Sequence, residues 1–158
     1  MDKKQSFDIA KNTLLTLFGV QIKNDWDLTP DNIAKILENK CAELEWKKIE
    51  NWEQFETGNE IITNEYFIEI LFSGVNMKNG KVIIITDECF NDKMAYNIEA
   101  NKTIEFINNY ERDYGIAFFQ PSDYIFIFSD ENIIVLLHHG GIYSKYNYID
   151  KPTMGVMG

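Results

Sequence analysis

The chain has 158 residues, of which 45% are hydrophobic and 25% are charged, and its formal net charge is −10. This composition is typical of one globular domain and not of a disordered segment. The acidic balance argues against direct binding to nucleic acid or to an anionic membrane, because the phosphate groups of either would repel the chain.

The first predicted element is a helix over residues 6–18. Apolar residues recur there at three- and four-residue steps, which is the period of one helix face. Ser6 is placed to cap the start of this helix, and Gly19 is placed to end it. The basic pair near the N-terminus is not followed by an uninterrupted apolar segment, so we expect no signal peptide and a cytoplasmic location.

A second helix is predicted after Thr29, which is suited to the N-cap, with Pro30 at the first helical position. Lys47 and Lys48 are expected near its end, where positive charge is favourable. Its buried stripe is predicted to consist of Ile33, Ile36, Leu37, Cys41 and Leu44.

From residue 66 the apolar pattern changes to period two, which predicts a strand over 66–75. The Asn79-Gly80 pair is a strong turn signal, so this strand is expected to form a hairpin with residues 81–86. A third strand is predicted at 94–98. A helix follows, capped by Asn101 and ended by Gly115.

The last third predicts strands at 123–128, 133–138 and 142–148. Residues 133–137 are apolar at every position, which favours a central strand covered on both faces. We therefore predict a single α+β domain over residues 1–150 and a flexible tail over 151–158. The domain should hold a largely antiparallel sheet of about six strands, two N-terminal helices, and one helix between the third and fourth strands.

The pair His138-His139 is the first candidate for chemistry. Adjacent residues of a strand point to opposite faces, so both rings could bind one metal ion only if a bulge followed, which Gly140-Gly141 could supply. A zinc site also needs three or four ligands, and the sequence has no HxH, HxxxH or CxxC spacing. We expect no metal site and no cofactor.

A Cys–His–Asp arrangement is the second candidate. Cys89 follows Asp87-Glu88, and either histidine could approach it across the sheet. A reactive thiol needs an electropositive setting, and two neighbouring carboxylates provide the opposite. We therefore expect no catalytic residue at Cys89, and we interpret Cys41 as a buried, inert thiol.

The most informative segment is an acidic tract that also carries aromatic residues. From Glu43 to Glu69, eight glutamates stand against two lysines, so this stretch holds more than half of the chain's net charge. Aromatic anchors inside complementary charge are typical of tight protein interfaces, although inward-packed aromatics with solvated glutamates would give the same pattern. The predicted partner-binding residues are Trp46, Glu50, Trp52, Glu53, Phe55, Glu56, Glu60, Glu65 and Tyr66.

The stretch PSDYIFIFSDENIIVLLHHGGIY, residues 121–143, resembles a hairpin of small bacterial immunity proteins. These proteins neutralise toxins of polymorphic or contact-dependent growth-inhibition systems. The resemblance covers about a seventh of the chain, and hairpins of this kind occur in many folds. It implies a cytosolic inhibitor of one toxin domain, often a basic nuclease, and it assigns no site residue.

The leading hypothesis is therefore a binding protein and not an enzyme, with a basic toxin domain as its partner. Three alternatives stay open: a small hydrolase that uses the His138/His139 region, an acidic phage inhibitor that mimics DNA, and a homo-oligomer joined through an open edge strand. The sequence does not fix whether the chain forms a homodimer.

Overall fold

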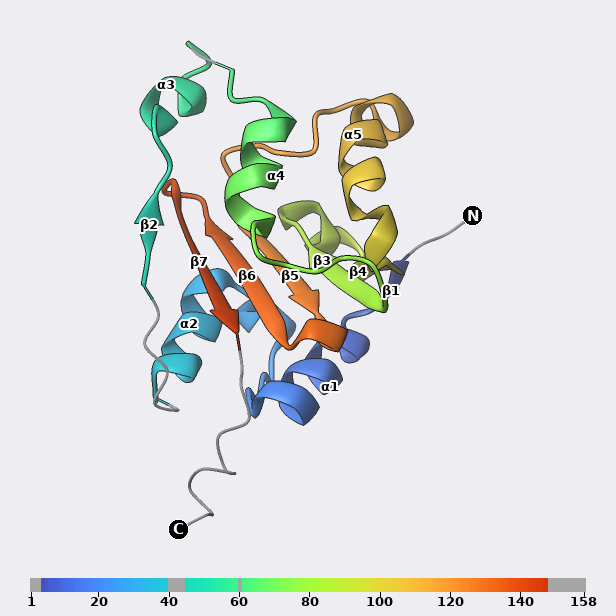
Figure 1. Ribbon diagram of the computed structural model, residues 1–158. Helices are drawn as coiled ribbons and strands as arrows, with labels where there is room; N and C mark the ends of the chain where they lie inside the picture. Colours follow the sequence, from blue (N-terminus) through green and yellow to red (C-terminus); the bar gives the residue numbers. More distant parts are fainter. Residues whose placement is uncertain (1–3, 40–44, 60, 148–158) are drawn as a thin grey trace.

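One antiparallel sheet runs through the protein and carries helices on both faces (Figure 1). The computed structural model describes residues 4–39, 45–59 and 61–147. Within these residues the sheet has seven strands in the order β1-β4-β3-β5-β6-β7-β2. The strands are β1 (Lys4–Ser6), β2 (Lys47–Lys48), β3 (Lys81–Ile85), β4 (Met94–Glu99), β5 (Tyr124–Phe128), β6 (Ile133–His138) and β7 (Ile142–Asn147). The predicted α+β class and the single domain are confirmed.

The described part of the chain has five α-helices. Figure 1 shows α4 and α5 over one face and α1 and α2 over the other, while α3 lies beyond the end of β2. The helices are α1 (Phe7–Phe18), α2 (Pro30–Asn39), α3 (Trp52–Glu56), α4 (Asn64–Phe72) and α5 (Thr103–Tyr114). Single turns of 3₁₀-helix lie at Asp25–Asp27, Asp87–Asn91, Ala100–Lys102 and Ser129–Glu131. None of the described helices has both the length and the apolar character needed to cross a membrane.

The core lies on both sides of the central strands. Every residue of β5 is buried, and so are residues 133–137 of β6, as predicted for a strand covered on both faces. Phe72 of α4 packs edge-on against Phe126 and Phe128 of β5, with ring centroids 5.0 and 5.6 Å apart. On the opposite face, Phe18 of α1 contacts Tyr146 of β7.

The predicted helix boundaries hold where a cap defines them. The Ser6 hydroxyl accepts a hydrogen bond from the backbone N–H of Asp8, and Gly19 ends α1 with a positive φ of 69°. Thr29 caps α2 in the same way by accepting from the N–H of Asn32 at 3.2 Å. Gly115 ends α5 with a φ of 87°.

The predicted strand over 66–75 is wrong, because this segment forms α4. Thr63 caps it by accepting from the N–H of Tyr66, and Phe67 and Leu71 are fully buried one helical turn apart. Because all of residues 66–72 except Glu69 are apolar, they also fit a period of two, which hid this helical period. Consequently the Asn79-Gly80 turn closes no hairpin with residues 66–75, and β3 instead pairs with β4 and β5.

Two further boundaries differ from the prediction. The helix α2 ends at Asn39, and Lys47 and Lys48 form the edge strand β2, which pairs with β7. Asn101 lies in a 3₁₀ turn and does not cap α5, which begins at Thr103. Cys41, Leu44 and the tail over 151–158 lie outside the described residues. Two of the seven strands, β1 and β2, were not predicted, because these short edge strands carry too few residues to show a period. With the predicted strand over 66–75 lost to α4, the sheet has seven strands instead of about six.

Candidate functional site

The described glutamates of the acidic tract lie in or beside β2, α3 and α4, and Figure 1 shows β2 at the edge of the sheet with α3 beyond its end. This part of the molecule is called the acidic corner. Within the described part of the chain, none of these glutamates forms an ion pair or a hydrogen bond through its carboxylate. The exposed members are Glu45, Glu50, Glu53, Glu56, Glu65 and Glu69. Glu43 and Glu60 fall outside the described residues. The carboxylates of this corner are therefore free to attract a cationic partner.

The aromatic residues of the tract do not share this exposure. The Trp52 side chain is only 6% exposed and packs edge-on against Phe67 of α4, so it belongs to the core and is not available as a surface anchor. Phe55 is half-buried between these two rings. Trp46 is half-buried and lies edge-on against His138, with ring centroids 6.2 Å apart. Tyr66 is half-buried beside Phe67.

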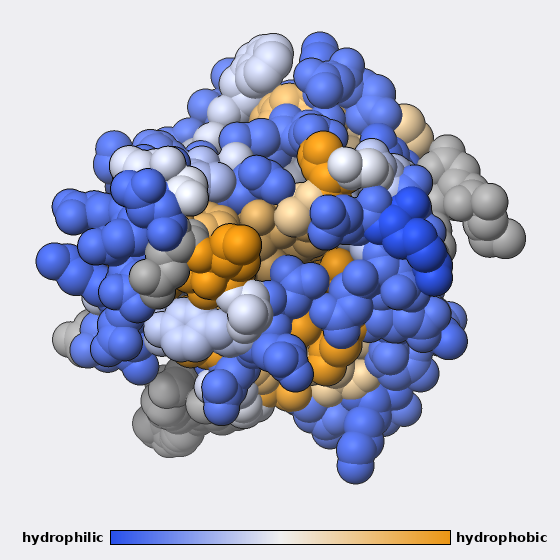
Figure 2. Space-filling model, turned by 90° about the horizontal axis from the view of Figure 1, so that it is seen from above, coloured by the Kyte–Doolittle hydropathy of each residue, from blue (hydrophilic) through white to orange (hydrophobic). Residues whose placement is uncertain are grey.

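An apolar residue that sequence reasoning missed lies among the exposed carboxylates. Ile61 is 85% exposed, the highest value of any large hydrophobic side chain described. It lines a shallow pocket of about 210 Å³ together with Glu50, Asn51, Ile62, Thr63 and Tyr66. Seen from above, Figure 2 shows apolar patches enclosed by hydrophilic residues at this end of the molecule. The sequence could have indicated this residue, because Ile61 and Ile62 lie between Glu60 and Thr63, the cap of α4.

The two histidines lie at the carboxyl end of β6, where a tight turn follows. The strand ends at His138, the N–H of Gly141 donates to the carbonyl of His138 at 3.0 Å, and Gly141 has a φ of 86°. This turn overrides the alternation expected for a strand. The two imidazole rings therefore lie on the same side and stack, with centroids 4.1 Å apart and planes inclined by 27°.

Carboxylates hold both rings in defined orientations. The N–H of Gly140 donates to Nδ1 of His138 at 2.8 Å, so the proton of this ring is on Nε2, which donates to Asp31 Oδ2 at 3.1 Å. Oδ1 of Asp123 accepts from both the backbone N–H and the Nδ1 of His139, at 2.7 and 2.9 Å. Asp31 opens α2 and Asp123 precedes β5, so distant parts of the chain build the cluster.

A third carboxylate adjoins this group. Asp87 follows β3, and its carboxylate lies beside Ser122 and Asp123. Partial burial and then the charge of Asp123 raise the pKa of Asp87 above its usual value. The sheet thus brings together the ends of β3 and β6 and the start of β5.

Cys89 does not join the histidines. Its thiol is fully buried, lies 3.3 Å from the backbone N–H of Thr86 and 3.5 Å from the hydroxyl of that residue. Burial raises the pKa of this thiol, which keeps it protonated and unreactive. The Cys–His–Asp arrangement weighed from the sequence therefore has no nucleophile at this position.

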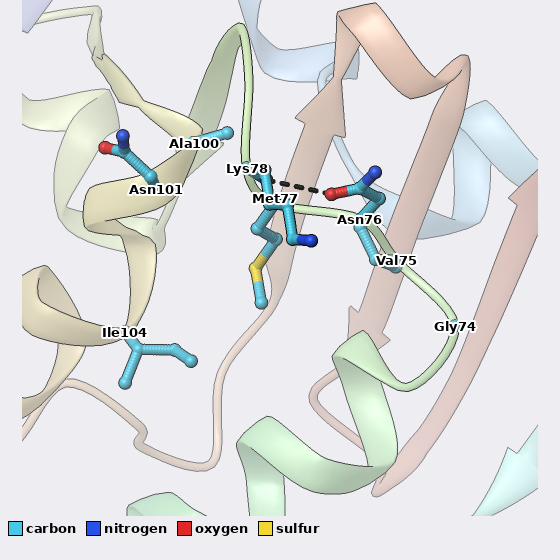
Figure 3. Close-up of a pocket in the computed structure, with 8 residues that line it drawn as sticks. All are labelled: Gly74, Val75, Asn76, Met77, Lys78, Ala100, Asn101 and Ile104. Carbon is cyan, nitrogen blue, oxygen red and sulfur yellow. Dashed lines mark hydrogen bonds between the residues drawn. The ribbon is translucent and has the colours of Figure 1, made fainter.

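The cavity in Figure 3 lies between the loop after α4 and the start of α5 and measures about 580 Å³. Met77 and Ile104 extend toward each other across it, while the side chain of Asn76 accepts a hydrogen bond from the N–H of Lys78. Its lining contains no carboxylate and no imidazole among the described residues. It is thus separate from both the acidic corner and the histidine cluster.

Comparison of the chain with models of known protein families, with curated proteins and with solved structures finds no match. The features that bear on function are therefore the acidic corner and the cluster of His138 and His139.

Proposed function

We propose that the protein is a cytosolic immunity protein that binds and neutralises a basic toxin domain through an acidic surface. This acidic surface consists of Glu50, Glu53, Glu56, Ile61, Glu65 and Tyr66. The observation that carries the proposal is an isoleucine that is 85% exposed and lines the same pocket as Glu50, whose carboxylate has no ion-pair partner within the described residues. Trp52 is left out of the surface because its side chain is buried.

The acidic surface supports binding in two steps. The glutamates attract a cationic partner over a distance of about 10 Å at moderate salt, which raises the rate of association. Ile61 and the exposed edge of Tyr66 then lose water against the partner, and this apolar burial supplies the part of the affinity that salt does not screen. The bound chain would cover the toxin's active site and exclude its substrate.

The test is co-expression with the product of the gene immediately upstream, since immunity genes commonly follow their toxins. The wild-type chain should restore growth and co-purify with that product. The double variant Glu53→Lys/Glu56→Lys should lose association rate, and Ile61→Asp should raise the dissociation rate. The matched control Glu105→Lys/Glu111→Lys makes the same change of charge on α5 and should bind as wild type.

Failure of the upstream product to bind the chain, or equal rates for both double variants, would contradict the proposal. Rates measured at low and high salt separate the two steps. The association rate of the wild-type chain should fall steeply as salt rises, whereas that of Glu53→Lys/Glu56→Lys should change less.

A second function is favoured by one observation, the hydrogen bond from His139 Nδ1 to Asp123. A carboxylate that orients an imidazole in this way leaves Nε2 as a proton acceptor, which is the arrangement of a general base in hydrolases. Because the thiol of Cys89 is buried, such an enzyme would not use this thiol as its nucleophile. Hydrolysis of simple esters that is equal in wild type and His139→Ala would exclude this function.

The acidic surface is also compatible with an inhibitor that mimics DNA. Such an inhibitor would compete with DNA for a host enzyme, whereas an immunity protein would bind its toxin whether or not nucleic acid is present. A competition experiment with duplex DNA distinguishes the two.

A further inference from the structure

We propose that Asp123, His138 and His139 form a binding site for a divalent transition-metal ion such as Zn²⁺. Each of the three residues offers one ligand atom, and these atoms lie within 4.8 Å of one another. Ligands bound to zinc at about 2.1 Å lie about 3–4 Å apart, so small side-chain rotations suffice to bring the three atoms onto one ion.

The turn after β6 removes the geometric objection to such a site. In a regular strand, the rings of adjacent histidines would point to opposite faces of the sheet. Here the chain turns immediately after His138, and the two rings stand side by side with centroids 4.1 Å apart. Asp123 is fixed to the same turn because its carboxylate accepts the backbone N–H of His139.

The hydrogen bonds show which lone pairs the ion would use. Nδ1 of His138 carries the lone pair that accepts the N–H of Gly140. The ion would take the place of this N–H, which belongs to an exposed residue. Nδ1 of His139 and Oδ1 of Asp123 are 2.9 Å apart, close to the spacing of two adjacent ligands on one ion. The proton on His139 Nδ1 moves through solvent to Nε2, so His139 stays neutral and the site keeps the charge of one carboxylate.

The surroundings favour a cation. Asp31 accepts from Nε2 of His138, which is the carboxylate–histidine–metal arrangement that fixes a ligand ring. Asp87 adds a further carboxylate beside Asp123. Two imidazoles and one carboxylate, without a thiolate, suit zinc, nickel or cobalt better than calcium or magnesium. His139 is exposed, which leaves room for water or a partner's group at the remaining positions.

The chain is well suited to a direct test because its only two histidines are both in this cluster. The full chain, prepared without a histidine tag and treated with a chelator, is titrated with Zn²⁺ by calorimetry. We expect one ion per chain. The variants His139→Gln and Asp123→Asn should bind more than about ten-fold more weakly, and Asp31→Asn about ten-fold more weakly. The control Glu105→Gln, which removes an exposed carboxylate elsewhere, should bind as wild type.

Two spectroscopic measurements on the wild-type chain do not depend on the folding of any variant. Zn²⁺ should shift the Nδ1 ¹⁵N resonances of both imidazoles. Co²⁺ should give visible d–d bands without the near-ultraviolet charge-transfer band of a cobalt thiolate. Imidazole resonances that do not move with excess zinc, undiminished binding by His139→Gln, or a thiolate band would each overturn the proposal, the last by placing the ion at a cysteine.

Discussion

Gly141 lies directly against the indole of Trp52, so that a Cβ atom at this glycine would overlap the ring. Gly141 also has a φ of 86°, a backbone conformation that residues with a side chain rarely adopt. Gly141→Ala should therefore strain the turn after β6 and push α3 away from the sheet. We expect a loss of about 2–4 kcal/mol in the free energy of unfolding, measured with urea, from backbone strain and overpacking together.

The matched control for this loss is Gly58→Ala. Gly58 has nearly the same backbone conformation, with a φ of 82°, but nothing lies within 4 Å of the position its Cβ would take. The Gly58→Ala variant should lose only about 1–2 kcal/mol of the free energy of unfolding, because its backbone is strained but its Cβ meets no other atom. Equal losses at the two glycines would mean that the contact with Trp52 does not hold α3.

The hydroxyl of Tyr124 holds the segment that leads into β5. It donates to the carbonyl of Phe118 at 2.6 Å and accepts the N–H of Gln120 at 2.6 Å. Tyr124→Phe leaves both backbone groups without this partner, so the free energy of unfolding should fall by about 1–3 kcal/mol. Tyr114→Phe is the control, because the Tyr114 ring is 49% exposed and its hydroxyl makes no hydrogen bond to the described residues.

The same tyrosine predicts a dependence on alkaline pH. Burial raises the pKa of Tyr124 above its usual value near 10. The unfolded chain therefore loses this proton at a lower pH than the folded chain does. The stability that Tyr124 contributes is complete below about pH 10 and declines as the pH rises above it. Wild type should lose more stability than Tyr124→Phe between pH 9 and 11; parallel curves would contradict this.

The fold could be predicted where local chemistry and tertiary packing agree. Caps at Ser6 and Thr29 marked helix starts, and the uninterrupted apolar run at 133–137 marked a central strand. The helix over 64–72 could not be predicted, because residues 66–72 are apolar at every position but Glu69 and so satisfy both a period of two and a period of four. Only packing against β5 and β7 decides between them.

The candidate site was predictable in its charges and not in its geometry. Exposed glutamates follow from the high energy of burying a charge, whereas tryptophan is found both in cores and at interfaces. Trp52 takes the core because Gly141 leaves space for its ring, a contact across 89 positions of sequence. The stacking of His138 and His139 depends on one turn, which the Gly140-Gly141 pair permitted without specifying it.

The buried thiol of Cys89 should resist alkylation. The thiolate is the reactive form, and burial both raises the pKa of this thiol and blocks the reagent. In a Cys41→Ser background, iodoacetamide should label native protein far more slowly than free cysteine, and only after urea is added should the rate approach that of free cysteine. Mass spectrometry of the peptide that contains Cys89 measures this. Rapid labelling without urea would contradict this prediction, because it would show an accessible and reactive thiol that could act as a nucleophile.

Repulsion between Glu65 of the acidic surface and its neighbour Glu69, which lies next to that surface in the acidic tract, should reduce the stability of the free chain. Glu65 and Glu69 are exposed one helical turn apart on α4, so their carboxylates repel. Glu69→Gln should raise the free energy of unfolding by about 0.3 kcal/mol at low salt, and less at high salt. The control Glu105→Gln should act in the opposite direction, because Glu105 lies in the first turn of α5 and pairs with Lys102. If Glu69→Gln instead destabilised the chain, Glu69 would have a favourable partner within the chain, and its repulsion of Glu65 would not be the dominant interaction.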